Sequence, residues 1–138
     1  MLELSYCNLT GDIPPELGLM QKLSYLHLGA NQLIGAMPAS LGNLTNLYYL
    51  ALEVNKLSGS VPPTLGNIVA LENLFLQNNN LAGNMEFLST LSDCKNLHLL
   101  NIGVNSFTCS LPDNIMGNLT SRLVTFTAGY NKLACGLP

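Results

Sequence analysis

The sequence predicts an α/β repeat solenoid, a single domain of about six stacked repeats over residues 1–138. The first observation is a repeated skeleton: "GANQLIGAMPASLGNLTNL" at residues 29–47 returns 24 residues later as "EVNKLSGSVPPTLGNIVAL". The second is composition. Hydrophobic residues make up 48% of the chain and charged residues only 9%, so the polar surface depends on neutral side chains such as the 17 Asn.

Copies of the pattern L-x-L-x-x-N-x-L-x-G-x-x-P cover the whole chain. Their first position is Leu2, Leu26, Leu50, Leu74, Leu100 and Phe126, at intervals of 24 residues and then of 26. The alternation in L-x-L predicts a short strand with both leucines on one face, and stacked copies predict a parallel, concave sheet. The Gly-x-x-Pro segment predicts a second extended piece. The "LGNL" segment predicts a loose helical or 3-10 turn that returns along the convex side.

A column of Asn residues follows the strands of the second to sixth copies, at Asn31, Asn55, Asn79, Asn105 and Asn131. We expect each side-chain amide to bond backbone groups of neighbouring coils, because such groups are otherwise unpaired where the chain turns. Cys7 takes the Asn position in the first copy, and Cys94 replaces a core leucine. We expect both thiols to be buried and to act as small apolar residues.

The positions that vary between copies flank the inward leucines, so their side chains point to the concave surface. Aromatic residues gathered there with polar neighbours are typical of surfaces that recognise proteins or peptides. The alternative is that β-propensity alone favours Tyr and Phe on strands. The predicted ligand-binding residues are Tyr25, His27, Tyr49, Glu53, Asn73, Phe75, Gln77 and Asn101.

Charge and motif content argue against several classes of function. The net charge is −3 and the five Lys and Arg residues are scattered, so nucleic acid is not an expected partner. His27 and His98 lie several coils apart with no nucleophile fixed beside them, so we expect no enzyme. No Gly-rich phosphate loop and no Cys/His spacing of a zinc site occurs, so no cofactor or metal is expected. No apolar run reaches the roughly 20 residues of a membrane span.

The repeats resemble the plant-specific class of leucine-rich repeat, whose consensus is L-x-G-x-I-P followed by L-G-x-L-x-x-L. The matching segments are "LTGDIPPELGLMQKL", "LIGAMPASLGNLTNL" and "LSGSVPPTLGNIVAL". The stretch "MEFLSTLSDCKNLHLLNIGVNSFTCSLPDNIMGNL" is similar to a longer repeat of grass receptor-like kinases, in the subfamily that includes bacterial-immunity receptors.

This resemblance covers all 138 residues, but only as an ectodomain. It implies an extracellular recognition module at the surface of the cell, which binds a peptide or protein ligand and has a co-receptor ectodomain as a further partner. It implies no kinase activity for this chain. Two alternatives stay open: a secreted inhibitor-type repeat protein that binds a microbial enzyme, and a truncated fragment without a partner.

Three sequons for N-glycosylation begin at Asn8, Asn43 and Asn118, and the last two fall on the convex return. They agree with the secretory location that the resemblance implies. Cys109 and Cys135 take the same Gly position in neighbouring copies, with Cα atoms expected about 5 Å apart. A disulfide and two free thiols both stay open, because lateral pairing on neighbouring strands is geometrically awkward.

Both ends of the repeat array look uncapped. The first copy begins inside a strand and the last stops within a coil. Because terminal coils normally need a capping repeat, we expect end-to-end association or frayed termini.

Overall fold

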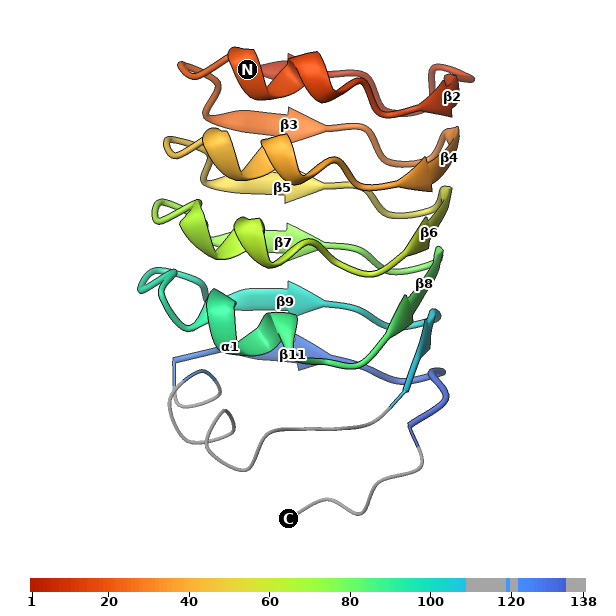
Figure 1. Ribbon diagram of the computed structural model, residues 1–138, viewed down its shortest axis with the longest axis vertical. Helices are drawn as coiled ribbons and strands as arrows, with labels where there is room; N and C mark the ends of the chain where they lie inside the picture. The colour runs from red at the N-terminus through yellow and green to blue at the C-terminus, as the bar shows by residue number, and fades with distance from the viewer. Residues whose placement is uncertain (109–118, 120–121, 134–138) are drawn as a thin grey trace.

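The computed structural model describes residues 1–108, 119 and 122–133, and it shows a stack of similar coils (Figure 1). One short strand from each coil joins a six-stranded parallel sheet in the order β1-β3-β5-β7-β9-β11. These strands are β1 (Leu2–Glu3), β3 (Tyr25–His27), β5 (Tyr49–Ala51), β7 (Asn73–Phe75), β9 (Leu99–Asn101) and β11 (Thr125–Thr127). The predicted α/β solenoid with a parallel sheet is confirmed.

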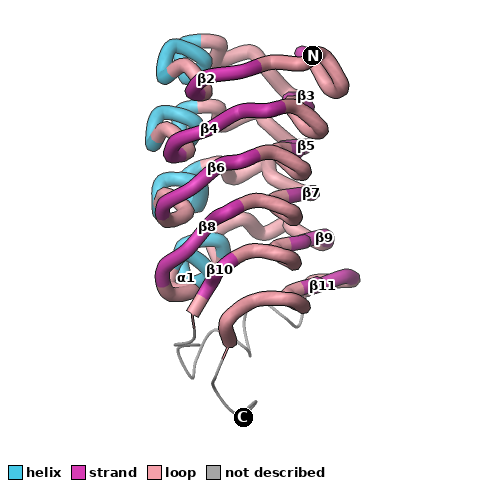
Figure 2. The backbone as a smooth tube through the Cα atoms, turned by 90° about the vertical axis from the view of Figure 1, so that its right-hand side faces the viewer, coloured by secondary structure: helices cyan, strands magenta, loops and turns pink. Residues whose placement is uncertain are grey.

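A second parallel sheet is formed by the extended pieces that follow the turns. Its strands are β2 (Thr10–Asp12), β4 (Gln32–Ala36), β6 (Lys56–Gly59), β8 (Asn80–Gly83) and β10 (Ser106–Phe107). Figure 2 shows this sheet along one side of the stack, between the helical turns and the six-stranded sheet. Each coil therefore turns a first corner after its Asn and a second corner before its helical turn.

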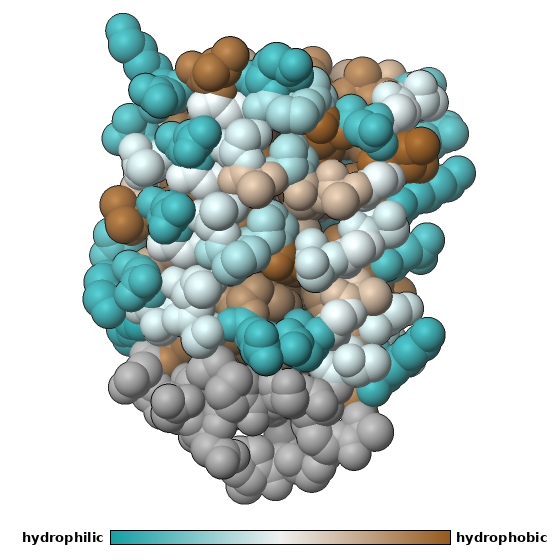
Figure 3. Space-filling model, viewed as in Figure 1, coloured by the Kyte–Doolittle hydropathy of each residue, from teal (hydrophilic) through white to brown (hydrophobic). Residues whose placement is uncertain are grey.

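The helical turns line the side of the stack that faces away from the six-stranded sheet (Figure 2). They are the 3-10 turns η1 (Pro15–Leu19), η2 (Ala39–Asn43) and η3 (Pro63–Asn67), and the α-helix α1 (Phe87–Leu91). Figure 3 looks onto this side, where hydrophilic and neutral side chains dominate and apolar groups are scattered. Among the described residues, no helix has the length and apolar character needed to cross a membrane.

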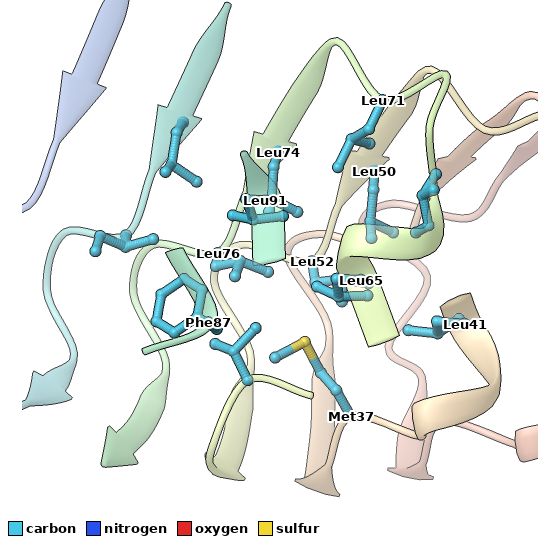
Figure 4. Packing of buried hydrophobic residues seen from close by; sticks show 14 of the residues in the cluster. Met37, Leu41, Leu50, Leu52, Leu65, Leu71, Leu74, Leu76, Phe87 and Leu91 are labelled. Carbon is cyan, nitrogen blue, oxygen red and sulfur yellow. The ribbon is translucent and has the colours of Figure 1, made fainter. Parts of the chain in front are cut away.

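Inward leucines from the strands and the helical turns meet in one continuous core. The strands pair in register, so that Leu26, Leu50, Leu74 and Leu100 form one column, and each of the four is fully buried. In Figure 4, Leu50 and Leu74 point toward Leu65 and Leu91 of the helical side. Each buried leucine contributes about 1.5–3 kcal/mol relative to an exposed one. A coil can bury this face only by stacking against its neighbours.

Small residues let the helical turns stack closely. A Cβ atom on Gly42 in η2 would overlap the backbone oxygen of Thr64 in η3. The Thr64 hydroxyl donates a hydrogen bond to the Ala39 carbonyl at 2.7 Å, which ties the two turns together. Glycine is needed here because any side chain would push the two coils apart.

The fourth helical turn differs from the first three because its entry residue is not proline. Pro14, Pro38 and Pro62 precede η1, η2 and η3 with extended backbone angles, φ −66° to −69° and ψ 130° to 135°. Glu86 precedes α1 with helical angles, φ −63° and ψ −27°. Proline disfavours the helical conformation in the residue before it and constrains the entry to the turn, so its absence accompanies a true α-helix.

The Asn column bonds the backbone as expected. Asn55 Oδ1 accepts the Leu33 N–H at 3.0 Å, while Asn55 Nδ2 donates to the carbonyls of Leu28 at 3.0 Å and Leu52 at 3.1 Å. The Leu52 carbonyl also accepts Asn79 Nδ2 at 3.0 Å. Successive Asn side chains therefore share carbonyls and form a ladder along the stack.

The residue before each of these Asn has a left-handed backbone, with φ between 52° and 57° at Ala30, Val54, Asn78, Val104 and Tyr130. The chain turns sharply here, and Val54, Val104 and Tyr130 are exposed beyond the ends of their strands. A left-handed residue other than glycine costs about 1–2 kcal/mol, which the Asn ladder must offset.

The expectation that both Cys7 and Cys94 are buried is wrong for Cys7. Cys7 is exposed, since its coil has a described neighbour on one side only, and its thiol donates to the Ser5 carbonyl at 3.3 Å. Cys94 is fully buried as expected, and burial raises the pKa of its thiol to about 11. The proposed pair Cys109 and Cys135 lies outside the described residues.

Candidate functional site

The outward side chains of the six-stranded sheet form a surface that we call the strand face. Along β3 and β7 the central leucine is buried and its two neighbours are half-buried, which is the alternation that a strand requires. Tyr25 and His27 therefore point outward from β3, and Asn73 and Phe75 from β7. Ala51 on β5 also flanks an inward leucine, yet it is fully buried, so larger neighbouring side chains close over it.

Three aromatic rings stand side by side on this face. The Tyr25 and Tyr49 rings are parallel to within 9°, with centroids 4.4 Å apart, because the two residues pair directly in the β3–β5 register. Phe75 follows at 5.5 Å from Tyr49 with its plane tilted by 47°. Tyr48 lies 6.2 Å from Tyr25 and extends the group toward the edge of the strands. Offset and tilted pairs at these distances are the arrangements that aromatic rings prefer.

A charge bridge crosses three coils next to the aromatic rings. His27 Nδ1 lies 3.0 Å from Glu3 Oε2, and His27 Nε2 lies 2.9 Å from Glu53 Oε1. A neutral imidazole can donate from one nitrogen only, whereas carboxylates only accept, so the two contacts together require a protonated His27. Tyr25 adds a hydrogen bond from its hydroxyl to Glu3 Oε2 at 3.2 Å.

The bridge shifts the pKa values of its members. Hydrogen bonds from Ser5, with a smaller contribution from His27, lower the pKa of the Glu3 carboxyl to about 2. Partial burial lowers the pKa of His27, but the hydrogen bonds to Glu53 and Glu3 and their charges outweigh it, so the net shift is upward. Burial first, then the neighbouring Tyr49 and Glu3, raise the pKa of Tyr25 to about 12. The raised pKa of His27 favours its charged form, and the raised pKa of Tyr25 favours its neutral phenol.

Gly29 makes room for the second half of the bridge. A Cβ atom at Gly29 would stand 2.6 Å from the Glu53 carboxylate, so a side chain at this position would displace Glu53 from His27. The other carboxylate oxygen, Glu53 Oε2, is buried and has no hydrogen-bond partner, and the same holds for Gln77 Oε1. Glu53 and Gln77 occupy equivalent positions on neighbouring coils, since the Val54 N–H donates to the Gln77 carbonyl at 2.9 Å.

The structure brings together Tyr25, His27, Tyr49, Glu53 and Phe75 from the predicted set. The other three predicted residues lie around this group. Asn73 pairs with Tyr49 in the strand register, and Asn101 pairs with Phe75, but Asn101 Oδ1 accepts the Gly103 N–H at 3.0 Å and so supports its own turn.

Glu3 and Tyr48 belong to this group but were not among the predicted residues. Glu3 stands in the same strand column as His27, with β1 pairing Glu3 to His27, so the register alone could have found it. Tyr48 precedes β5 by one residue, so it lies ahead of the first column of predicted positions, the column that contains Tyr25 and Tyr49. Within the described residues, no three His, Cys, Asp or Glu side chains lie close enough to hold a metal ion.

Comparison with known proteins agrees with this architecture. The family profile described as Leucine Rich Repeat matches residues 1–20 and 22–44. A comparison with curated protein sequences finds no match.

Solved structures give fuller matches. The chain is 36% identical to the receptor in the PEPR1–AtPEP1 crystal structure, with a TM-score of 0.91, covering 99% of this chain and 19% of that one. It is 32% identical to the ectodomain of the receptor kinase SOBIR1 from Arabidopsis thaliana, with a TM-score of 0.84, covering 96% and 70%. It is 35% identical to the plant peptide hormone receptor RGFR1, solved with RGF2, with a TM-score of 0.83, covering 90% and 19%.

Stacked parallel strands, an Asn ladder and helical returns define the class of leucine-rich-repeat solenoids, which are non-catalytic binding modules. The chain belongs to the leucine-rich-repeat family that includes the ectodomains of plant receptor kinases. It spans about a fifth of the length of the matched chains in the PEPR1 and RGFR1 structures, and 70% of the SOBIR1 ectodomain chain.

Proposed function

We propose that the chain is the extracellular ligand-recognition module of a plant leucine-rich-repeat receptor kinase, and that it binds a peptide or protein on its strand face. The observation that carries the proposal is the stack of Tyr25, Tyr49 and Phe75, which points away from the core. The proposed binding residues are Tyr25, His27, Tyr49, Glu53, Asn73, Phe75, Gln77 and Asn101.

The fold depends chiefly on the leucine core beneath the aromatic stack. Each fully buried leucine contributes about 1.5–3 kcal/mol, whereas Tyr25, Tyr49 and Phe75 are only half-buried, so a smaller share of their apolar surface is removed from water. Rings held in place by stacking lose little conformational freedom when a partner covers them. Tyr25 and Tyr49 are therefore well suited to serve as rigid anchors for a ligand.

Related ectodomains support a peptide ligand and a second receptor as partners. RGFR1 was solved with RGF2 and PEPR1 with AtPEP1, and HAESA was solved with the peptide hormone IDA and the co-receptor SERK1. We extend this to the present chain as a peptide or protein ligand, with a co-receptor ectodomain as a further partner, at the outer surface of the plasma membrane. The segment at residues 85–119 resembles a longer repeat of grass receptor-like kinases, and this resemblance favours the subfamily that includes bacterial-immunity receptors.

The proposed glycans at Asn8 and Asn43 leave the strand face free. Asn43 is exposed at the end of η2, on the side of the stack away from the six-stranded sheet. Asn8 is exposed in the turn that precedes β2. The third sequon, at Asn118, lies outside the described residues. Replacing Asn43 with Gln in secreted protein should remove one glycan mass without changing ligand affinity.

The test starts from a random peptide library displayed on phage and selected on the immobilised chain. Peptides recovered from it are synthesised, and their dissociation constants are measured by calorimetry. We expect Tyr49→Ala combined with Phe75→Ala to weaken binding by about 30-fold or more, because two aromatic anchors are lost. Circular dichroism should show that the double variant keeps its fold, since the leucine column is untouched.

Ile34→Ala is the matched control. Ile34 is an apolar side chain on β4 of the second sheet and is 48% exposed, so it offers similar area away from the strand face. Its loss should leave affinity within about twofold. Equal weakening by Ile34→Ala and by the double variant would show that the strand face is not the binding surface.

A further inference from the structure

We infer that the ligand presents a cationic side chain, arginine or lysine, to the part of the strand face formed by Tyr49, Phe75, Glu53 and Gln77. This inference rests on the proposed function, because it specifies the chemistry of the ligand that the strand face binds. Three observations lead to it: the balance of charge on the face, acceptor oxygens without donors, and aromatic rings beside them.

The charge on the strand face is negative. The charge bridge contains the two carboxylates of Glu3 and Glu53 and the imidazole of His27, so its net charge is −1 with His27 protonated, as its two contacts require. No Lys or Arg stands within the described strands of the six-stranded sheet. Lys95 and Arg122 both donate to the Ser92 carbonyl, just after α1, at 3.1 Å and 2.7 Å. Among the described residues, no Lys or Arg forms an ion pair with Glu3 or Glu53.

Two acceptor oxygens on this face have no donor. Glu53 Oε2 and Gln77 Oε1 are buried and unpaired, and they belong to equivalent positions on adjacent coils. A buried acceptor without a donor is unfavourable, so a ligand that brings donors gains more here than at a hydrated surface. An ammonium group brings three donors and a guanidinium five, together with the positive charge that Glu53 requires.

The neighbouring rings favour the same kind of group. Cations are attracted to the faces of aromatic rings within about 6 Å of the centroid. Tyr49 and Phe75 lie 5.5 Å apart with a 47° tilt, directly beside the strand end that leads to Glu53. A planar guanidinium can stack on a ring and bond a carboxylate at once, so we expect arginine to bind more tightly than lysine.

The test compares the arginine and lysine content of the peptides selected from the phage library. We expect the peptides whose binding depends on Tyr49 and Phe75 to be enriched in arginine or lysine. Replacing that basic residue with norleucine in a synthetic peptide should weaken binding to the wild-type chain by about tenfold. Raising the salt concentration should reduce this loss only in part, because partly buried ion pairs are screened less than exposed ones.

Glu53→Gln supplies the decisive comparison, since it removes the charge and keeps the shape. On this variant the norleucine substitution should cost little, so the two changes should be non-additive. Glu16→Gln on η1 is the matched control, because Glu16 is exposed on the helical side. Gln77→Glu should act in the opposite direction and tighten basic peptides several-fold.

The outcomes separate this inference from the proposed function. Peptides that need Tyr49 and Phe75 but carry no basic residue would overturn the inference and leave the proposed function standing. The same holds if the norleucine substitution costs as much on Glu53→Gln as on the wild type. If no selected peptide depends on Tyr49 and Phe75, the proposed function fails and this inference fails with it.

Discussion

Replacing Asn79 with Ala tests the Asn ladder, because Asn79 is the most deeply buried member described, with 8% of its surface exposed. Asn79 Oδ1 accepts the Leu57 N–H at 3.0 Å, and Asn79 Nδ2 donates to the carbonyls of Leu52 at 3.0 Å and Leu76 at 3.2 Å. The two carbonyls keep a second amide donor, since Leu52 also accepts Asn55 and Leu76 also accepts Asn105. The Leu57 N–H, in contrast, loses its Asn79 acceptor, and no other Asn side chain of the ladder accepts from it.

The cost of Asn79→Ala to the free energy of unfolding comes mainly from the Leu57 N–H, because the two carbonyls keep a donor. A buried N–H left without its acceptor costs about 1–3 kcal/mol, and the weaker bonding of two carbonyls adds about 1 kcal/mol. We therefore expect Asn79→Ala to lower the free energy of unfolding by about 2–4 kcal/mol. In urea, with a denaturant slope of about 1.5 kcal/mol/M, the midpoint should fall by more than about 1 M.

The assay is urea unfolding followed by circular dichroism, with Asn67→Ala as the control. Asn67 ends η3 and is exposed, so its substitution should change stability by less than about 0.5 kcal/mol. If Asn79→Ala shifts the midpoint no more than Asn67→Ala does, the ladder does not hold neighbouring coils together.

Two further predictions concern the stacking of the helical turns and the charge bridge. Gly42→Ala should destabilise the chain by about 1–3 kcal/mol, because the new Cβ overlaps the backbone oxygen of Thr64; an unchanged unfolding midpoint would contradict this packing. The raised pKa of His27 means that the bridge stabilises the fold fully below the unfolded value of 6.5, and that this stability is lost as pH rises through the folded pKa. Glu3→Gln should lower the His27 pKa in an NMR titration of the ring protons. An unchanged pKa would contradict the contact between His27 and Glu3.

The repeated part of the fold can be predicted from the sequence because each consensus residue has the same structural role in every coil. The inward leucines and the Asn column were predicted correctly because the repeat interval, 24 residues and then 26, sets the register of each strand of the six-stranded sheet to the next. The prediction for Cys7 was wrong because its coil has a described neighbour on one side only, whereas Asn31, Asn55, Asn79 and Asn105 in the same column have coils on both sides and are half-buried or buried. Burial thus depends on place in the stack as well as on place in the repeat.

The candidate site was only partly predictable for a different reason. The stacking of Tyr25 on Tyr49 follows from strand register, which the repeat interval defines. The contact between Glu53 and His27, in contrast, depends on the side-chain conformation of Glu53 and on the space left by the missing side chain of Gly29. A glycine beside a glutamate in one column was the available signal, but the repeat pattern explains that glycine equally well as a turn residue.

The most direct measurement of the central claim is an NMR map of where a selected peptide contacts the chain. Intermolecular NOEs are recorded between the labelled chain and the unlabelled peptide. We expect contacts from the peptide to the ring protons of Tyr25, Tyr49 and Phe75 and none to Ile34 on the second sheet. Contacts confined to the second sheet or to the helical turns, with these three rings unperturbed, would contradict the assignment of the strand face as the binding surface.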